Sequence, residues 1–335
     1  MNGRASMKFL KRAVTASILL NIASAWTLQV ACAQGEAYPS RPITWIVPYA
    51  PGAPADITMR KVADAMAGQL GGTIVIQNRA GGGGTIGAGA VAKSKPDGYT
   101  ILATIADPLV AQAGLQKNLP YDPAKDFVYI TKLTSSGAAM IGMSSLPANN
   151  AAELVDLAKK TPNGLAYGTF GAGSFPHIIM EALAKRSGAK FTPVHYRGSP
   201  QAIQEMIGGQ IAVTFGAGAA TQLINDGKVK MIVQLGETRG LNRNVPTFAE
   251  SGFDDLVFRT PLWMGLAAPA GTPKDIVDRT YKAARAALQK PDIKEFLTNL
   301  SFEAVGNSPE EFHREWKAEY DIIPKLIREL GIESN

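Results

Sequence analysis

The sequence predicts an α/β fold built from two lobes. Its 335 residues exceed what one hydrophobic core usually serves, and a composition of 46% apolar and only 19% charged residues suits well-packed globular lobes rather than disorder. Short β-rich runs alternate with helical patterns along most of the chain. Because strand, helix and strand follow one another, we expect mostly parallel sheets with right-handed crossovers, flanked by helices.

The first half of this alternation predicts buried strands at 43–47, 73–77 and 99–103. Between the first two, apolar residues recur at helical spacing from Met59 to Leu70. The second half predicts strands at 165–168, 191–195, 211–215 and 229–235. The sequence has no internal repeat or low-complexity linker, so we expect extended crossing segments near 133–141 and 259–265 to join the lobes.

Two helices near the C-terminus have clear start signals. Thr272 is the expected cap of one, with Pro273 next. Ser308 to Glu311 predicts a capping box for the other, with Pro309 at its first position. This last helix is expected to bury its aromatic residues at i, i+4 and i+8, which are Phe312, Trp316 and Tyr320.

The N-terminal 33 residues are typical of a secretory signal peptide. Four basic residues precede an apolar stretch from Ala13 to Ala31, and Ala31-Cys32-Ala33 forms an A-x-A cleavage site before Gln34. An uncleaved anchor is the alternative, but several polar residues interrupt the run, and Gln29 stands where a signal for lipidation of Cys32 would normally carry Leu.

Removal of this segment changes the charge. It holds four basic residues and no acid, so the remaining chain carries 30 basic residues against 28 acidic ones, a net charge of +2 rather than +6. The basic excess belongs mostly to the targeting segment, and no block of Lys or Arg indicates nucleic acid. The single cysteine, Cys32, is lost as well, which leaves no thiol chemistry.

The segment from Ile43 to Asp56 is the most informative part of the chain. An apolar strand leads into a turn of Pro, Gly and Ala, and an amphipathic helix follows at once. A helix N-terminus has free N–H groups and partial positive charge, so it can hold a small anion without any basic side chain. A capping role alone would also explain Asp56.

A literal G-x-G-x-x-G at Gly82 to Gly87, with Asp107 about twenty residues further, suggests a dinucleotide site. We reject this interpretation because 78–81 separate the glycines from the strand and because an exported protein has little reason to meet NAD. The four glycines 81–84 more plausibly let the loop approach a neighbouring backbone or a ligand closely. The absence of G-K-[ST] excludes a P-loop.

The stretch Gly171 to His177 opens a helix in the second half of the chain. Ser174 offers either a hydroxyl to an anion or a simple N-cap, and both interpretations stay open. Nucleophilic catalysis is disfavoured because the sequence has no G-x-S-x-G elbow.

The three histidines, His177, His195 and His313, lie far apart and lack cysteine partners, which argues against a zinc site. Arg197 could hold a carboxylate, but a surface or interlobe ion pair is the simpler role.

Several motifs together resemble a known family. They cover roughly residues 38 to 332 in order and include Tyr38-Pro-Ser-Arg-Pro-Ile43, Val47-Pro-Tyr-Ala-Pro-Gly52 with Asp56, Pro96-Asp-Gly-Tyr99, Leu119-Pro-Tyr-Asp-Pro123, Gly208-Gly209, Val245-Pro-Thr247 with Glu250-Ser-Gly252, and Ala268-Pro-Ala-Gly-Thr-Pro273. This set is similar to the Bug family, the extracytoplasmic solute receptors of tripartite tricarboxylate transporters.

The resemblance implies a two-lobed periplasmic binding protein of the type II kind that holds a small carboxylate mainly through backbone amides and hydroxyls. It implies a signal peptide at 1–33, a first lobe at 34–138 that returns at 262–335, and a second lobe at 139–261. The ligand contacts that it implies come from loops of both lobes: Ala53, Ala55, Asp56, Gly83, Gly84, Thr104, Ile105, Ser174, His177, Gly216 and Gly218.

The same resemblance implies a periplasmic monomer without cofactor, metal or catalytic residues, whose partners are the ligand and the membrane components of the transporter. Presentation of the ligand to a sensor kinase is an alternative function, and an exported enzyme acting on a carboxylic acid is a third.

Two departures from the motifs of this family put the usual ligand class in question. Gly52-Ala53-Pro54-Ala55 replaces the usual paired glycines, so Pro54 removes one N–H donor, and Ala80-Gly81-Gly82 replaces the more usual Pro-Gly-Ala.

We predict that the mature protein begins at Gln34. Ala31 and Ala33 supply the small residues that signal peptidase requires, and Gln29 disfavours lipidation. The intact mass of the exported protein tests this expectation. A diacylglyceryl group on Cys32, or a retained N-terminus, would contradict it.

Overall fold

The computed structural model describes residues 38–240, 242–300 and 302–333. The expectations for the signal peptide, its cleavage site and Cys32 lie outside these residues. The fold described here is that of the unit Pro42–Asn335. Among the residues described, no helix is both long enough and apolar enough to cross a bilayer.

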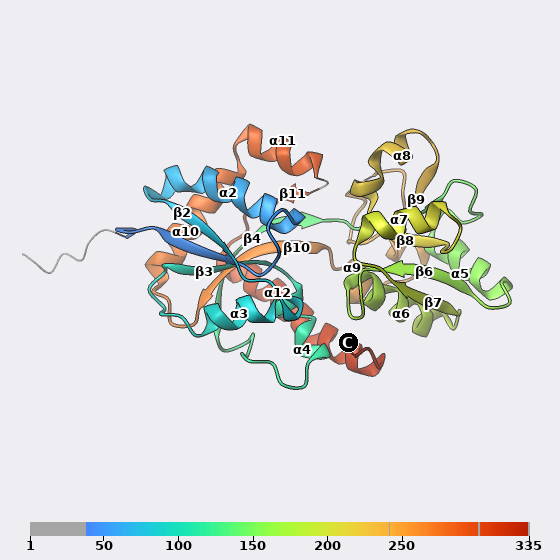
Figure 1. Ribbon diagram of the computed structural model, residues 1–335, viewed down its shortest axis with the longest axis horizontal. Helices are drawn as coiled ribbons and strands as arrows, with labels where there is room; N and C mark the ends of the chain where they lie inside the picture. The colour runs from blue at the N-terminus through green and yellow to red at the C-terminus, as the bar shows by residue number, and fades with distance from the viewer. Residues whose placement is uncertain (1–37, 241, 301, 334–335) are drawn as a thin grey trace, which may run out of the picture. The chain divides into compact units, whose positions relative to one another are not determined.

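Two separate sheets form the framework of this unit (Figure 1). The first sheet has six strands in the order β11-β4-β10-β3-β1-β2. They are β1 (Ile43–Val47), β2 (Ile74–Asn78), β3 (Thr100–Ile105), β4 (Phe127–Ser136), β10 (Leu262–Pro269) and β11 (Glu303–Ala304). The second sheet has five strands in the order β7-β6-β8-β5-β9. They are β5 (Ala139–Met143), β6 (Leu165–Thr169), β7 (Phe191–His195), β8 (Val213–Phe215) and β9 (Val229–Gln234).

The two-lobed α/β class is confirmed, but the expectation of mostly parallel sheets is wrong. In the first sheet β1 pairs in parallel with β2 and β3, whereas β10 runs antiparallel to both β3 and β4. In the second, β6 is parallel to β7 and β8, whereas β5 is antiparallel to β8 and β9. The reason is that the chain leaves the first sheet along β4 and returns along β10, so these neighbours run in opposite directions.

Helices cover both faces of each sheet. In Figure 1, α2, α10 and α11 lie on one side of the first sheet and α3, α4 and α12 on the other, while α7 and α8 lie opposite α6 on the second sheet. The longer helices are α2 (Pro54–Leu70), α3 (Thr85–Ala92), α5 (Ala151–Lys160), α6 (Phe175–Ser187), α7 (Ser199–Ile207), α10 (Lys274–Leu288), α11 (Pro291–Asn299) and α12 (Pro309–Glu329). The short ones are α4 (Gln112–Leu115), α8 (Thr221–Asn225) and α9 (Leu256–Arg259), with 3₁₀ turns η1 (Gly82–Gly84), η2 (Asp107–Leu109), η3 (Ala217–Ala220) and η4 (Ala249–Ser251).

The local sequence explains most helix boundaries. The expected capping box of α12 is present, with the Ser308 hydroxyl accepting from the Glu311 amide and the Glu311 carboxylate accepting from the Ser308 amide. The expectation for Thr272 is wrong: Pro273 is the N-cap residue of α10, and the Thr272 hydroxyl donates to the Pro269 carbonyl oxygen instead. Pro273 makes no side-chain cap, so α10 depends on its packing against α2 and β4 rather than on a cap.

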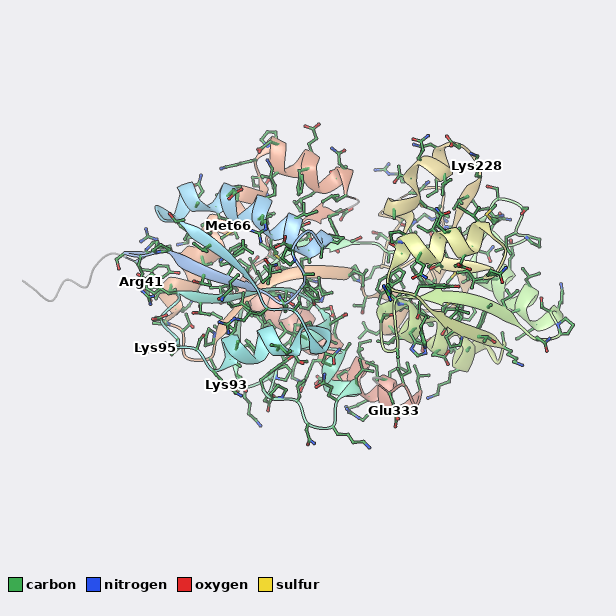
Figure 2. The ribbon with its side chains drawn as sticks, in the orientation of Figure 1. Arg41, Met66, Lys93, Lys95, Lys228 and Glu333 are labelled. Carbon is green, nitrogen blue, oxygen red and sulfur yellow. The ribbon has the colours of Figure 1, made fainter. Side chains whose placement is uncertain are left out.

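The apolar pattern predicted the core well. Trp45, Trp263 and Trp316 are buried, as is Met66, which Figure 2 labels on α2. Charged side chains such as Lys228 and Glu333 lie at the periphery of the same view. β8 begins at Val213 rather than at residue 211.

The last helix, α12, packs an aromatic stripe into the core. Phe312 and Trp316 are fully buried, as expected, but Tyr320 is only partly buried. The neighbouring Glu319 is buried instead, at 6% exposure. Its carboxyl accepts a hydrogen bond from the Trp263 indole at 2.8 Å. The helical period placed the aromatic stripe correctly but did not reveal the acid beside it.

We predict that Glu319→Gln flattens the dependence of stability on pH. Burial raises the pKa of Glu319 from 4.5 to about 7, although the Trp263 hydrogen bond and Lys132 act in the opposite direction. The native state therefore binds more protons than the unfolded state between about pH 4.5 and 7, so the protein loses stability as pH rises through this range. Glutamine keeps the acceptor for Trp263 without the charge.

Thermal or urea unfolding from pH 5 to 8 measures the effect. The variant should match the wild type near pH 5 and exceed its stability by up to about 3 kcal/mol near pH 8, since one pKa unit corresponds to about 1.4 kcal/mol. Glu295→Gln, at an exposed position of α11, is the matched control and should leave the slope unchanged. Identical slopes in wild type and Glu319→Gln would contradict the prediction.

Candidate functional site

Asp56 ties together the first loop, between β1 and α2. Its carboxylate accepts hydrogen bonds from the Gly52 amide (2.9 Å), the Asn78 side-chain amide (2.8 Å) and the Arg60 guanidinium (3.0 Å). Burial acts to raise the pKa of Asp56, but these bonds outweigh it and hold that pKa below its ordinary value. The loop itself therefore uses the carboxylate that the resemblance assigns to the ligand.

The two alanines of this loop have different surroundings. Ala53 is the N-cap residue of α2, and its amide donates to the Ala50 carbonyl oxygen at 3.2 Å. Pro54 has no N–H, and Ala55 is buried. The start of α2 consequently offers fewer free donors than a helix N-terminus usually does. Ligand contacts by Ala53 and Ala55 stay predictions.

The four-glycine loop forms a tight turn against the segment after β3. Gly83 has φ +63°, and a Cβ atom there would lie 2.2 Å from the Gln112 side-chain nitrogen. Gly84 has φ +91°, and a Cβ atom there would lie 2.6 Å from Pro108 and 3.4 Å from the Tyr49 hydroxyl. Only glycine fits both positions. The close approach that the sequence predicted for these glycines is thus made to protein side chains, directly before α3.

Several polar groups lie close together at the end of β3. Thr104 is fully buried, and its hydroxyl donates to the Ile105 carbonyl oxygen at 3.0 Å. The enclosed Tyr49 hydroxyl makes no hydrogen bond of acceptable geometry with the described residues. Burial and then the charge of Asp107 raise the pKa of Tyr49 well above its ordinary value, although Thr104 and the Ile105 backbone act to lower it. The structure thus brings Gly84, Thr104 and Ile105 together around Tyr49.

In the second lobe, the loop between β6 and α6 is held by its own side chains. The Ser174 hydroxyl donates to the Gly171 carbonyl oxygen (2.8 Å) and accepts from the Phe170 amide (3.2 Å). Ser174 occupies the N-cap position of α6, but its side chain makes no capping bond. Of the two interpretations left open, the N-cap holds for the position of Ser174 but not for its side chain: the hydroxyl shapes the loop and leaves the helix N-terminus without a side-chain cap. A contact of Ser174 with an anion stays a prediction.

His177 controls another amide of this loop. Its Nδ1 accepts a hydrogen bond from the Gly173 amide at 3.0 Å, so Nδ1 carries no proton. Burial lowers the pKa of His177, the charge of Glu181 raises it, and His195 lowers it further. His177 is therefore held neutral, and its hydrogen bond fixes the position of the Gly173 amide. Next to it, His195 Nδ1 lies 2.6 Å from the Thr169 hydroxyl, which also accepts from the Gly171 amide.

The remaining loops of the second lobe follow β7 and β8. Gly216 has φ +125°, and a Cβ atom there would lie 2.8 Å from Ser199 at the start of α7. The Gly218 carbonyl oxygen accepts from the Thr221 hydroxyl at 2.8 Å. Arg197 is exposed, and its guanidinium makes no ion pair with any described residue, so the surface ion pair expected from sequence is not observed. Because β6, β7 and β8 are parallel, all three loops emerge at the same edge of the sheet.

The two lobes meet at these loops. A Cβ atom on Gly173 would lie 2.6 Å from Leu115 of α4, so the second-lobe loop contacts the first lobe directly. A cavity of about 70 Å³ lies between the lobes, with Ala106 and Asp107 on one wall and Phe175 and Ile178 of α6 on another. The first loop makes no hydrogen bond across to the second lobe among the residues described.

Asp107 is the residue that sequence reasoning missed. The sequence relates it only to a dinucleotide motif, yet it lies two residues beyond β3 and lines the interlobe cavity. Burial raises its pKa to about 6. Its position just past the carboxyl end of a strand was the signal that could have found it.

The described residues limit the chemistry of the site. In this part of the chain, no group of three or more His, Cys, Asp or Glu side chains could hold a metal ion. The Ser174 hydroxyl is bound within its loop, and His177 Nδ1 is occupied by a backbone amide, so these two do not form a nucleophile and base pair. The arrangement offers amide donors and glycine turns, which suit binding.

Comparison with known proteins agrees with this arrangement. Residues 58–332 match the model of the tripartite tricarboxylate transporter family receptor. The chain is 32% identical over 328 residues to the UPF0065 protein in the tcbD-tcbE intergenic region of Pseudomonas sp. (strain P51), covering 95% of each chain.

Solved structures give the same result. The periplasmic binding protein BugD is 32% identical with a TM-score of 0.72, covering 89% of this chain and 100% of its own. An R. palustris protein with adipate is 28% identical with a TM-score of 0.75, covering 89% and 100%. MatC from Rhodopseudomonas palustris with bound malate is 28% identical with a TM-score of 0.71, covering 87% and 100%.

We predict that Ser174→Ala weakens binding of a carboxylate more than it weakens the fold. Loss of the two loop bonds should cost about 1 kcal/mol of stability, whereas displaced amide donors should lower affinity by roughly 1.5–3 kcal/mol, or about ten- to a hundredfold. Calorimetric titration beside thermal melts separates the two effects. Ser308→Ala, which removes the capping hydroxyl of α12, is the control and should lower stability by about 1 kcal/mol with unchanged affinity. Equal affinities of wild type and Ser174→Ala would leave Ser174 a purely structural role.

Proposed function

This chain belongs to the tripartite tricarboxylate transporter receptor family, and we propose that it captures a small carboxylate solute in the periplasm and delivers it to the membrane components of such a transporter. The family assignment makes it a solute-binding receptor. The ligand class, capture between the lobes, delivery and removal of residues 1–33 on export are the parts that we infer.

The observation that carries this proposal is the meeting of glycine-rich loops from both lobes. The loop at 171–174 contacts α4, and the loop at 82–84 packs beside the same helix through Gln112. Each loop precedes the N-terminus of a helix, α6 or α3, that has no side-chain cap. Such N-termini favour a negative charge, so a carboxylate with one or two acidic ends matches what the loops present.

The energies agree with such a receptor. Micromolar affinity corresponds to about −8 kcal/mol, and each hydrogen bond to a charged group contributes roughly 1.5–3 kcal/mol. Three to five amide or hydroxyl contacts could supply that affinity if lobe closure adds desolvation at little cost. The contacts that we propose are those at Ala53, Ala55, Gly83, Gly84, Thr104, Ile105, Ser174, Gly216 and Gly218, with His177 acting through Gly173. Asp56 is a weaker candidate because its loop already uses its carboxylate.

The relatives support the ligand class. Two of the similar structures hold adipate and malate, which are both dicarboxylates. A catalytic role has less support. The acids of the interlobe cavity are Asp107 and Glu319, and Glu319 is hydrogen-bonded to Trp263. Presentation to a sensor kinase and action as a monomer stay predictions from the resemblance alone.

We predict that a small carboxylic acid raises the melting temperature of the protein. A ligand that binds only the native state stabilises it by about 2.7 kcal/mol at a hundredfold excess over Kd. Differential scanning fluorimetry against a panel of mono-, di- and tricarboxylic acids measures this shift, with the neutral amides of the same acids as controls. The amides should have much smaller effects. A panel without any hit, or one whose hits are sugars or metal cations, would refute the carboxylate receptor.

A further inference from the structure

The loop between β6 and α6 depends on a hydrogen bond whose acceptor can be protonated near neutral pH. The Gly173 amide donates to His177 Nδ1 at 3.0 Å, in the first turn of α6. A backbone N–H can only donate, so this bond forms only while Nδ1 carries no proton. Histidine has an ordinary pKa of about 6.5, so its charge changes within the physiological range. Protonation of His177 therefore removes the acceptor of the Gly173 amide.

The surroundings of His177 allow both states of its imidazole. Nε2, which holds the proton of the neutral ring, lies 4.0 Å from Glu181 Oε1, one turn further along α6. The same oxygen accepts a hydrogen bond from the Tyr167 hydroxyl of β6 at 2.7 Å, which fixes the carboxyl in place. Burial lowers the pKa of His177, the charge of Glu181 raises it, and His195 of β7 lowers it further. Glu181 thus offers a charged His177 a partner, whereas burial favours the neutral ring.

Among the residues described, the ionisable groups that face His177 are Glu181 from α6, His195 from β7 and, through Glu181, Tyr167 from β6. The first lobe approaches the loop with the apolar side chain of Leu115. No charge from the first lobe therefore offsets a proton on His177.

His195 contacts the same loop but does not have this dependence. Its ring centroid lies 5.1 Å from that of His177, and its Nδ1 lies 2.6 Å from the Thr169 hydroxyl, which accepts from the Gly171 amide at 3.2 Å. A hydroxyl can donate to an unprotonated Nδ1 or accept from a protonated one. The contact with Thr169 therefore survives a change of protonation, and the Gly173 amide is the group that a proton disconnects.

The loop that this bond holds lies where the lobes meet. Gly173 has φ +75°, and a Cβ atom there would lie 2.6 Å from Leu115 of α4, so its peptide has little room to move. The Gly173 amide has no second acceptor among the residues described, and an unsatisfied donor is costly. A proton on His177 therefore favours a rearranged loop, in which the N–H groups at the start of α6 are no longer held in place.

We propose that His177 is a positioning residue that makes ligand capture proton-dependent: neutral His177 holds the loop at 171–174 in its binding form, and protonated His177 releases the loop and with it the ligand. The inference rests on the proposed function and adds regulation to that site. His177 acts through the Gly173 amide, so it needs no contact of its own with the ligand. The receptor then loads at neutral pH and unloads in a mildly acidic medium.

The direction of the effect follows from the two forms of the loop. In the binding form the pKa of His177 lies below its ordinary value, whereas in the released form it returns toward about 6.5. The binding form thus takes up fewer protons, so it keeps its full advantage above pH 6.5 and loses it as the pH falls below that value. At pH 5 the released form gains at most about thirtyfold, and the apparent affinity falls with the fraction of loops in the binding form.

Two measurements test the proposal. Nuclear magnetic resonance of ligand-free protein labelled with ¹⁵N-glycine follows the Gly173 amide from pH 8 to 5, and its resonance should shift in step with the titration of the His177 ring. Calorimetric titration with succinate, adipate, citrate and benzoate gives the affinity at pH 7.5 and pH 5. For the tightest binder of the four, the wild type should lose at least fivefold in affinity at pH 5.

Three variants separate positioning from structure. His177→Asn places a carbonyl oxygen near the position of Nδ1 and cannot become charged, so its loss of affinity at pH 5 should stay within about twofold. Protonation of the ligand itself affects both proteins equally and cancels in this comparison. His177→Phe removes the acceptor and should bind at pH 7.5 as weakly as the wild type does at pH 5. His313→Asn, the same change at an exposed position of α12, is the matched control and should keep the wild-type response to pH.

The outcomes separate the inference from the function that it extends. If the wild type and His177→Asn lose affinity equally between pH 7.5 and pH 5, or if the Gly173 resonance does not follow His177, the inference is overturned and the carboxylate receptor stands. Undiminished binding by His177→Phe at pH 7.5 would overturn it as well. Failure of all four acids to bind at either pH would refute the proposed function, and the inference with it. Thermal melts of each variant show whether it is folded.

Discussion

The packing of α12 against the paired strands β4 and β10 is the constraint on which the rest of the structure depends. Gly265 has no side chain, and a Cβ atom there would lie 2.6 Å from the Phe312 ring, so the helix rests directly on the strand. Trp316 stacks on Tyr129 of β4 with ring centroids 4.2 Å apart. Aromatic contacts of this kind fix the angle of a helix as well as its distance.

The same helix positions the wall of the candidate site. The Trp316 indole donates to the Leu109 carbonyl oxygen at 3.0 Å, and the Arg328 guanidinium donates to the Ala113 carbonyl oxygen at 3.0 Å. Gly114 approaches the backbone of Pro324 closely enough that a Cβ atom would lie 2.8 Å away. These contacts with α12 therefore fix the segment from η2 through α4. That segment carries Asp107 and Leu115, the residue that contacts the second lobe.

The sequence predicted the elements better than it predicted the site. The strand Ile43–Val47 was placed at its observed bounds because burial on both faces leaves a nearly continuous apolar run. Phe191–His195 was also placed at its observed bounds, although only Phe191 of this strand is buried. The strand β10 was not predicted, because 259–265 was expected to be a crossing segment and no local signal records which strand a returning segment joins. The family resemblance indicated which loops form the site, but it did not reveal the role of each side chain in those loops. Whether Asp56, Ser174 and His177 face a ligand or their own loop depends on hydrogen bonds between residues four or more positions apart.

The route of the chain through the two sheets sets the order in which the lobes can be completed. The strands of the second sheet all lie between Ala139 and Gln234, so that lobe can assemble from one continuous stretch. The first sheet must join β4 to β10 across more than a hundred intervening residues, and α12 covers it only with the last turns of the chain. Contacts of such long separation slow folding because loop closure costs entropy before the contacts form. We therefore expect the wall that carries Asp107 to become rigid late in folding.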